Sequence, residues 1–493
     1  MNYVSTRGID SLGVSSAYAI KTGLAADDGL YMPEEIPAIT ISEIEELVAL
    51  PYTERAARIL SKFLTDYTYE ELLADAEGAY AEAKFGSSPA PITSLGQIEM
   101  LELWHGPTSA FKDMALQIMP RLFVRALRKC GEERCALILV ATSGDTGKAA
   151  LEGYRDVAGT KIKVFYPSEG VSRVQKLQMQ TQEGENVSVS GIIGNFDDAQ
   201  TGVKRIFADE DIRRELDAGG VFLSSANSIN WGRLVPQIVY YVSAYCDLVG
   251  AKRIALGDKI DVCVPTGNFG NIFAAYIAKL MGLPIEKLVC ASNKNNVLTD
   301  FLRTGKYDRN RAFHATMSPS MDILISSNLE RLLYVTLGAE KTRGYMESLQ
   351  SAGEYSLSED DFRKISESFV GYFTDEAECA ATIKEIYENK NCLIDTHTAV
   401  AIHATYAYIG ESKAERKVVV ASTASPYKFA RDVYRSLTDG DTDGDLEALE
   451  ALHRLTGVDI PTPLASILHK EIRHTGVIDR CEMADATLAF AQG

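Results

Sequence analysis

Two kinds of hydrophobic pattern divide the chain. From Ile41 to Phe85, apolar residues recur at helical spacing, in segments such as SEIEELVALPYTERAARIL. This stretch ends in GSSPAPITSLGQ, whose glycine, serine and proline content is typical of a linker. The pattern therefore predicts a mostly helical N-terminal domain over residues 1–95.

After residue 95 the pattern changes to short apolar runs that alternate with amphipathic stretches. The runs are rich in β-branched residues and bounded by turn residues, and they cover 135–142, 161–167, 186–193, 260–267, 287–292 and 417–423. Such runs are typical of strands buried on both faces, and their alternation with helices predicts a parallel, doubly wound α/β sheet. The acidic, helical pattern of residues 357–391 predicts a surface helical insertion.

Composition and charge narrow the classes of function. The 493 residues carry a formal net charge of −18, which argues against binding to nucleic acid or anionic membranes. We find no apolar stretch long enough to span a membrane. The start MNYVSTRGID lacks the order of a secretory signal, and the eight cysteines form no CxxC pair, so we expect a cytoplasmic protein with free thiols.

One lysine stands out in HGPTSAFKDMALQ, residues 105–117. The apolar residues from Phe111 onward fall at helical spacing, so we expect Thr108 or Ser109 to cap a helix whose first turn carries Lys112. The positive end of a helix dipole disfavours an ammonium there, and burial lowers the pKa of a lysine toward the neutral amine that a Schiff base requires. From the spacing alone, a solvated surface lysine is the favoured alternative.

A glycine-containing segment, VPTGNFGN at 264–271, runs from a predicted strand into a predicted helix. Its glycines let backbone N–H groups converge on a phosphate at the start of the helix. A tight strand-to-helix turn without a ligand is the alternative.

Two more segments carry polar side chains suited to a carboxylate or a phosphate. ATSGDTGKAA, residues 141–150, offers hydroxyl and N–H groups at a second strand-to-helix turn, where Asp145 is alternatively an N-cap. SSANSINWGR, residues 224–233, adds an amide, a hydroxyl and the guanidinium of Arg233, which offers phosphate a bidentate fork unless it is simply solvated.

Taken together, these segments resemble the threonine synthase family. The resemblance runs in unbroken order through YVSTRG, GLAADDGLYMP, HGPTSAFKD, SGDTG, ANSINWGR, PTGNFGN, SNKNNVLTDFLRTGKY, SPSMDILISSNLER and STASPYKF. It implies the α/β fold of the tryptophan synthase β type, with mostly parallel, doubly wound sheets in two subdomains behind the helical domain of 1–95. Residues 96–240 would carry the cofactor lysine and the substrate site, and residues 241–493 the phosphate loop, the insertion and a C-terminal tail.

The resemblance also implies a cofactor and a reaction. The cofactor would be pyridoxal 5′-phosphate, with Lys112 as the Schiff-base lysine and Thr423 as the neutral hydroxyl that faces the ring nitrogen. The reaction would convert O-phospho-L-homoserine and water to L-threonine and phosphate by γ-elimination and β-addition, the last step of threonine biosynthesis. The further cofactor residues would be Asp145, Gly267, Asn268, Phe269, Gly270 and Asn271, and the substrate residues Ser143, Thr146, Asn227, Ser228 and Arg233.

Other interpretations stay open at this point. A phospho-lyase or dehydratase of the same fold would use the same cofactor, and a non-catalytic Rossmann-like protein that binds a metabolite would explain the glycine segment alone. Either a monomer or a small homo-oligomer is compatible with the sequence. The spacing of Asp439, Asp441, Asp443 and Glu450 matches a calcium loop, but the loop is solitary, so we favour an acidic turn and expect no metal. His397 lies in no zinc signature and is predicted to be an interior histidine.

Overall fold

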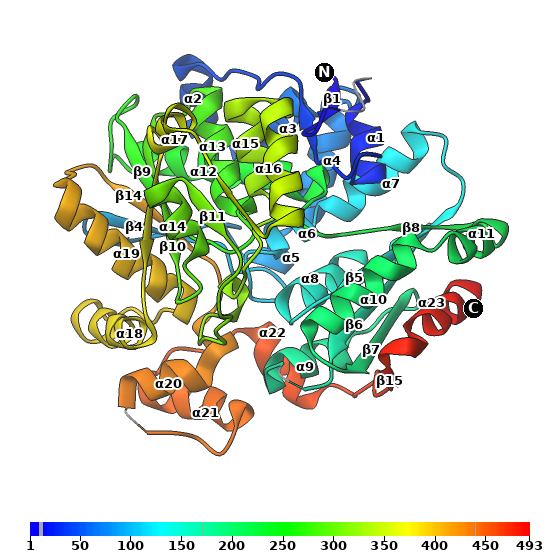
Figure 1. Cartoon of the computed structure of the whole chain (residues 1–493). Coiled ribbons are helices and arrows are strands. Elements are labelled where there is room, and N and C mark those ends of the chain that lie inside the picture. Colours follow the sequence, from blue (N-terminus) through cyan, green and yellow to red (C-terminus); the bar gives the residue numbers. More distant parts are fainter. Residues whose placement is uncertain (9–12, 170, 439) are drawn as a thin grey trace.

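The computed structural model describes residues 1–8, 13–169, 171–438 and 440–493. Two mainly parallel sheets, each covered by helices on both faces, organise the described chain (Figure 1). This is the α/β architecture that the alternation of strand and helix patterns predicts. The six apolar runs named above all form strands of these two sheets.

The smaller sheet has the strand order β15-β7-β6-β5-β8, and its neighbouring strands pair in parallel. Alternate residues of β5 point to opposite faces: Ile138 packs in the large core cluster, and Leu139 in a second cluster with residues of the outer helices. The strands are β5 (Cys135–Ala141), β6 (Thr160–Pro167), β7 (Val187–Ile193), β8 (Val221–Ser224) and β15 (Val477–Asp479), with α8 (Asp145–Tyr154) and α9 (Arg173–Gln180) on one face and α10 (Phe196–Ala208), α11 (Glu210–Ala218) and α23 (Met483–Gln492) on the other.

The larger sheet has the order β13-β10-β9-β14-β4-β3, parallel except for the antiparallel pair β3 and β4. Val262 faces the core cluster on one side, and Cys263 faces a separate cluster on the other. Its strands are β3 (Ile92–Leu95), β4 (Ile98–Glu102), β9 (Ile260–Pro265), β10 (Ile285–Ser292), β13 (Phe369–Phe373) and β14 (Val418–Ser422), and its main covering helices are α12 (Trp231–Gly250), α13 (Gly270–Met281), α14 (Val297–Thr304), α18 (Glu376–Lys390) and α19 (Thr396–Ser412).

The N-terminal region is mostly helical, as predicted, and packs on α12 of the α/β core. Thr40 and Thr68 each begin a helix with a capping box, in which a glutamate three residues later returns the hydrogen bond. Apart from β3 and β4, the elements that precede β5 are β1 (Tyr3–Ser5), α1 (Ser16–Thr22), β2 (Tyr31–Pro33), α2 (Ile41–Val48), α3 (Tyr52–Phe63), α4 (Tyr69–Ala79), α5 (Glu82–Phe85), α6 (Asp113–Leu116) and α7 (Met119–Lys129).

The remaining elements surround the larger sheet or lead to the C-terminus. They are β11 (Lys306–Asp308), η1 (Pro319–Met321), α15 (Leu329–Leu337), α16 (Ala339–Ser351), β12 (Glu354–Ser356), α17 (Glu359–Ser366), η2 (Pro426–Phe429), α20 (Ala430–Thr438), α21 (Asp445–Thr456), α22 (Thr462–Ala465), η3 (Ser466–His469) and η4 (Arg480–Glu482).

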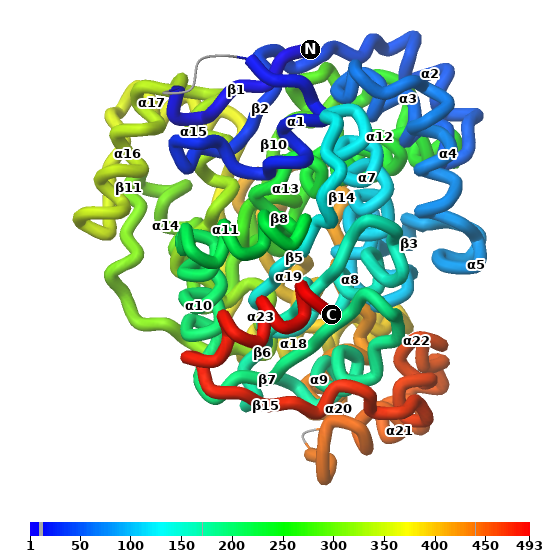
Figure 2. The backbone as a smooth tube through the Cα atoms, turned by 90° about the vertical axis from the view of Figure 1, so that its right-hand side faces the viewer, coloured from blue at the N-terminus to red at the C-terminus, as the bar shows by residue number. Residues whose placement is uncertain are grey.

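The structure differs from the predicted segment boundaries in three places. The expected linker contains β3, which pairs with β4, so residues 92–102 belong to the larger sheet. The C-terminal tail returns to the smaller sheet, where β15 lies beside β7 (Figure 2). Residues 357–391 are not a helical insertion, because β13 pairs in parallel with β10 and α17 and α18 flank it as a strand-helix unit of the sheet.

Candidate active site

Lys112 lies in the turn between β4 and the one-turn helix α6, at the start of that helix. The predicted cap by Thr108 or Ser109 is absent, and this prediction is wrong. Instead the carboxylate of Asp113 accepts hydrogen bonds from the backbone N–H and the hydroxyl of Thr108, both at 2.8 Å. The acidic residue after Lys112 therefore holds the turn, which the helical spacing alone did not reveal.

The Lys112 amine is buried, with 8% of the residue exposed, and has two polar partners. Its Nζ lies 3.3 Å from Asp145 Oδ2 and 3.2 Å from Ser320 Oγ. Burial lowers the pKa of Lys112, Asp145 opposes this effect, and the nearby cations Arg233 and Lys428 reinforce it. The surroundings thus favour the neutral amine that covalent bonding to an aldehyde requires.

Asp145 is the first residue of α8 and serves the site and not the helix end. The hydroxyl of Thr142 accepts hydrogen bonds from the backbone N–H groups of Gly144 and Gly147, at 3.0 and 2.9 Å. Thr142, and not Asp145, therefore satisfies the N–H groups at this helix start. Burial alone would raise the pKa of Asp145, but Lys428 and then Lys112 hold it well below the usual range. Asp145 is therefore an ionised carboxylate beside Lys112, not merely the N-cap that the sequence left as an alternative.

The glycine segment begins α13 from the end of β9, as predicted, and its backbone is held open. Phe269 takes a left-handed conformation with φ of 63°. A Cβ on Gly267 would lie 2.7 Å from the carbonyl oxygen of Ser320, so only glycine fits there without a shift. The hydroxyl of Ser326 donates to the Gly267 carbonyl at 2.7 Å, and the side-chain amide of Asn328 donates to the Asn268 carbonyl at 3.0 Å.

The predicted phosphate loop, residues 267–271, fits a phosphate group through its amides. The first N–H groups of α13 have no carbonyl partner within the helix and suit an anion. Asn271 adds an orphaned donor: its Oδ1 accepts from Tyr240 and Tyr241, while its buried Nδ2 has no hydrogen-bond partner among the described residues. The ring of Phe269 packs on Phe369, with centroids 5.6 Å apart, and is buried. Gly270 is buried, and Asn268 is exposed.

Thr423 is brought to the lysine by a short strand-like contact. Ala110 and Ala424 form an antiparallel bridge, and the Phe111 N–H donates to the Thr423 carbonyl at 2.8 Å. Thr423 is 5% exposed. The segment that carries Lys112 therefore lies beside the segment that carries Thr423, although the two residues are 311 positions apart in the sequence.

Of the predicted substrate residues, Arg233 and Thr146 contact each other. Arg233, on the first turn of α12, donates to the Ala226 carbonyl at 2.9 Å and to the Thr146 hydroxyl at 3.5 Å. Burial lowers the pKa of Arg233 to about 10, which leaves it charged at neutral pH. Ser143 is exposed, while Asn227 and Ser228 are half-buried in the turn before α12.

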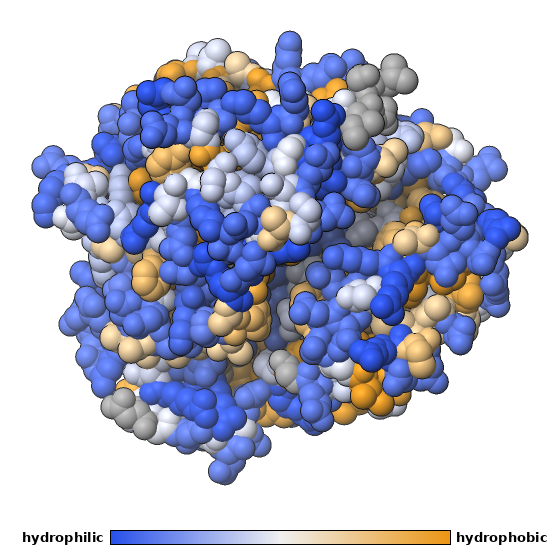
Figure 3. Space-filling view, viewed as in Figure 1, coloured by the Kyte–Doolittle hydropathy of each residue, from blue (hydrophilic) through white to orange (hydrophobic). Residues whose placement is uncertain are grey.

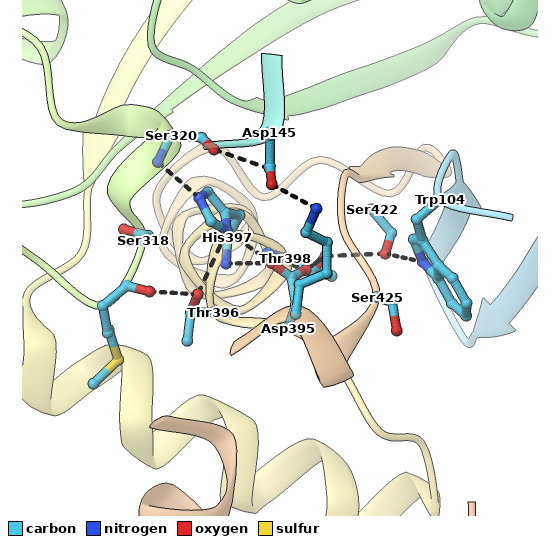
Figure 4. Close-up of polar contacts among 12 residues, drawn as sticks. Trp104, Asp145, Ser318, Ser320, Asp395, Thr396, His397, Thr398, Ser422 and Ser425 are labelled. Atoms are coloured by element: carbon cyan, nitrogen blue, oxygen red, sulfur yellow. Dashed lines mark hydrogen bonds and ion pairs between the residues drawn. The ribbon is translucent and has the colours of Figure 1, made fainter. Parts of the chain in front are cut away.

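Figure 4 shows polar residues around Asp145 and Ser320 to which the sequence assigned no role. The Ser320 N–H donates to His397 Nε2 at 3.2 Å, and His397 Nδ1 lies 2.8 Å from Asp395 Oδ2. His397 is the predicted interior histidine, and both of its ring nitrogens have hydrogen-bond partners. Ser320 links it to Lys112, because Ser320 contacts both residues. Ser422 accepts from the Trp104 indole at 3.0 Å and from Thr398 at 2.9 Å.

The acidic turn at 439–450 shows no metal site in the part of the chain that the structure describes. Asp441 forms bidentate ion pairs with Arg431 and Arg435, which use both of its oxygens. Asp439 lies outside the described residues. Over 1–8, 13–169, 171–438 and 440–493, no group of three or more His, Cys, Asp or Glu side chains is placed to hold a metal ion.

The site thus combines two helix starts, a lysine whose pKa is lowered, and the nearby cations Arg233 and Lys428. The start of α8 contacts Lys112 through Asp145, and the glycine loop before α13 meets Ser320, the other partner of Lys112. Figure 3 shows a hollow in the surface between the parts built on the two sheets. Converging amides, a buried amine and a charged arginine in an otherwise acidic protein suit a small anionic ligand with a carbonyl group.

Sequence and structure comparisons show the family to which the chain belongs. A family model described as pyridoxal-phosphate dependent enzyme matches residues 100–424, so the chain is a pyridoxal-phosphate-dependent enzyme of the α/β type. Models for the threonine synthase N terminus and C-terminal region match residues 2–80 and 398–480. The chain belongs to the threonine synthase family. This membership removes the support for a non-catalytic Rossmann-like protein.

Similar proteins include threonine synthases and proteins named threonine synthase-like 1. Threonine synthase of Pseudomonas aeruginosa is 38% identical over 443 residues, which cover 88% of this chain and 90% of that protein. Human threonine synthase-like 1 is 43% identical over 85% of this chain, and the match spans 57% of the human protein, little more than half its length. The crystal structure of PLP-bound threonine synthase from Brucella melitensis superimposes with a TM-score of 0.87 at 34% identity and covers 100% of both chains.

Within the described residues, no helix combines the length and the apolar character needed to cross a membrane.

Proposed function

We propose that this protein is a threonine synthase, which converts O-phospho-L-homoserine and water to L-threonine and phosphate. One observation carries the proposal: the Lys112 amine lies between Asp145, at the start of α8, and Ser320, which abuts the glycine loop before α13. Two anion-compatible helix starts therefore meet at one buried amine. A substrate with a carboxylate and a phosphate, used together with a phosphorylated cofactor, requires several such sites.

The residues have distinct roles in this proposal. Lys112 would hold pyridoxal phosphate covalently, residues 267–271 would bind its phosphate, and the Thr423 hydroxyl would face its ring nitrogen. When bound, the cofactor supplies an electron sink that stabilises negative charge on the substrate carbons. A neutral hydroxyl at the ring nitrogen does not stabilise a protonated ring as a carboxylate would, and so moderates that sink. Asp145 would lie beside the cofactor.

Proton transfer falls to the lysine and phosphate departure to the arginine. With cofactor and substrate bound, the buried Lys112 Nζ would be the base that takes and returns protons at the substrate carbons. Arg233, with Ser143, Thr146, Asn227 and Ser228, would bind the substrate anions. Charge grows on the phosphate as its C–O bond breaks, and a buried guanidinium stabilises that charge.

The product analysis tests this function. Purified protein with pyridoxal phosphate and O-phospho-L-homoserine should release threonine and inorganic phosphate in equal amounts. A second candidate, elimination of phosphate with 2-oxobutyrate as the product, deserves the same assay because relatives named threonine synthase-like 1 are more identical to this chain than the Pseudomonas threonine synthase is. Phosphate release with 2-oxobutyrate and no threonine would replace the first proposal with the second. Cytoplasmic location and a monomeric or small homo-oligomeric state stay predictions.

A further inference from the structure

A second lysine lies inside the site and has no role in the account so far. Lys428, in η2 just after β14, is 1% exposed. Its Nζ lies 2.7 Å from Asp145 Oδ1, 3.0 Å from Gln178 Oε1 and 3.1 Å from the Thr108 carbonyl. An ammonium has three N–H donors, and each has an acceptor here. Because lysine is almost never fully buried unless it is paired, this arrangement holds a fixed positive charge at one point.

The two lysines share Asp145 unequally. Oδ1 of Asp145 contacts Lys428 at 2.7 Å and accepts from the Gln175 amide at 2.8 Å. Oδ2 lies at longer distances, 3.3 Å from Lys112 Nζ and 3.4 Å from Ser320 Oγ. The carboxylate is therefore paired mainly with Lys428, and Lys112 has the weaker contact. A carboxylate paired with Lys112 alone would hold that amine in its charged form.

The charges that face Lys112 come from three elements. Asp145 is on α8, Arg233 on α12 and Lys428 in η2, and of these only Asp145 favours the ammonium form of Lys112. Asp113, next in the chain, uses its two oxygens on Thr108. Lys428 therefore acts on the Lys112 amine in two ways, by direct repulsion and by neutralising Asp145, the carboxylate that contacts it.

We propose that Lys428 is a positioning residue that neutralises Asp145 and so keeps the Lys112 amine uncharged and able to bond to an aldehyde. A neighbouring cation is one of the ways in which proteins activate a lysine nucleophile. The same contacts join the two halves of the site, since Lys428 follows a strand of the larger sheet while Asp145 and Gln178 belong to helices of the smaller one. The inference rests on the proposed role of Lys112 as the amine that binds pyridoxal phosphate.

The test measures the ionisation of Lys112 directly. Full-length protein freed of cofactor is mixed with pyridoxal phosphate over a range of pH, quenched with borohydride at short times, and digested to quantify the adduct at residue 112 by mass spectrometry. Only the uncharged amine attacks the aldehyde, so the pH midpoint of the capture rate follows the Lys112 ionisation. Lys428→Met should move this midpoint upward by about one pH unit or more, the size of effect that one nearby charge has on a buried amine. Lys428→Arg, which keeps the charge, should restore most of the original midpoint.

A matched control comes from another buried lysine. Lys148 is on α8, one turn beyond Asp145, is 7% exposed and pairs with Glu152 at 3.0 Å. Its hydrogen bonds and ion pair within the described residues go to Glu152 and Gln182, not to Asp145 or Lys112. Lys148→Met therefore removes a buried, paired ammonium of the same subdomain and should leave the capture midpoint unchanged.

Variants of Asp145 keep the test decisive if Lys428→Met does not fold. Asp145→Asn removes the carboxylate that contacts Lys112 Nζ and should move the midpoint downward. Asp145→Asn combined with Lys428→Met removes both charges of the buried pair, which is tolerated better than removing one, and should lie between the two singles. An unchanged midpoint in Lys428→Met, or in Asp145→Asn where Lys428→Met does not fold, would overturn the inference while leaving the proposed function intact. A parent protein that forms no adduct at Lys112 would overturn the proposed function itself.

Discussion

A methyl group at Gly267 should separate the glycine loop from the lysine site. A Cβ there would lie 2.7 Å from the Ser320 carbonyl oxygen and 3.4 Å from Met321 Cα, both backbone atoms that cannot rotate away. Ser320 would have to move by about 0.7 Å to restore an ordinary contact. Its hydroxyl lies 3.2 Å from Lys112 Nζ, so a shift of that size away from the lysine breaks the hydrogen bond. Overpacking of this kind costs about 1–3 kcal/mol of the free energy of unfolding.

The effect on function should exceed the effect on stability. Displacement of catalytic groups by about 1 Å lowers rates by up to about 100-fold, so we expect Gly267→Ala to lower both cofactor affinity and kcat by at least about tenfold. Urea unfolding gives the stability, and titration with pyridoxal phosphate followed by absorbance gives the affinity. Gly410→Ala is the control, because Gly410 is exposed on α19 with nothing within 4 Å of the added Cβ. It should raise stability by about 0.5–1 kcal/mol and leave cofactor binding unchanged. A Gly267→Ala protein with the parent's affinity and kcat would refute the packing argument.

Three further variants test the electrostatics of the fold and the site. Burial raises the pKa of Asp113 to about 6. The folded protein therefore keeps a proton that the unfolded chain loses above about pH 4, and the free energy of unfolding should fall by about 2–3 kcal/mol from pH 4 to 6. Urea unfolding should show this fall in the parent but not in Asp113→Asn. Burial lowers the pKa of Lys163 to about 8, so the charged amine is disfavoured in the folded state. Lys163→Met should therefore raise the free energy of unfolding by about 1–3 kcal/mol in urea denaturation at pH 7. This gain should shrink as the pH rises from 8 to 10. Arg233→Leu should raise KM for O-phospho-L-homoserine by about 10–100-fold in the steady-state assay, since a charge-assisted contact to phosphate is lost, and an unchanged KM would remove Arg233 from the substrate site.

The strands of the two sheets were predictable where burial on both faces made them apolar. The run at 135–142 is one example, since its alternate residues pack against helices on opposite sides of the smaller sheet. β13 is apolar, FVGYF, but it was missed because its five residues lie inside a longer acidic stretch with a helical pattern. The place of β15 was equally hidden, since a three-residue strand near the C-terminus carries no local signal of the sheet it joins.

The polar groups at the site show where sequence reasoning ends. Asp145 and the glycine loop were found because each follows a predicted strand, and such positions collect at one edge of a parallel sheet. Lys112 stood out at the start of a predicted helix, and the family resemblance assigned its role. Lys428 and Ser320 lie in segments that carry the family resemblance, but their contacts with Asp145 join positions 283 and 175 residues apart. No periodicity predicts such pairs, because only the packing of the two sheets brings them together.

The central claim is that the Lys112 amine forms the covalent bond to the cofactor, and the structure offers a direct rival in Lys428, which pairs with the same carboxylate. Borohydride reduction of the protein with pyridoxal phosphate, followed by peptide mass spectrometry, decides between them. We predict one reduced adduct, on the peptide that contains residue 112, and its loss together with threonine formation in Lys112→Ala. An adduct on Lys428, or threonine formation at the parent rate in Lys112→Ala, would contradict the account.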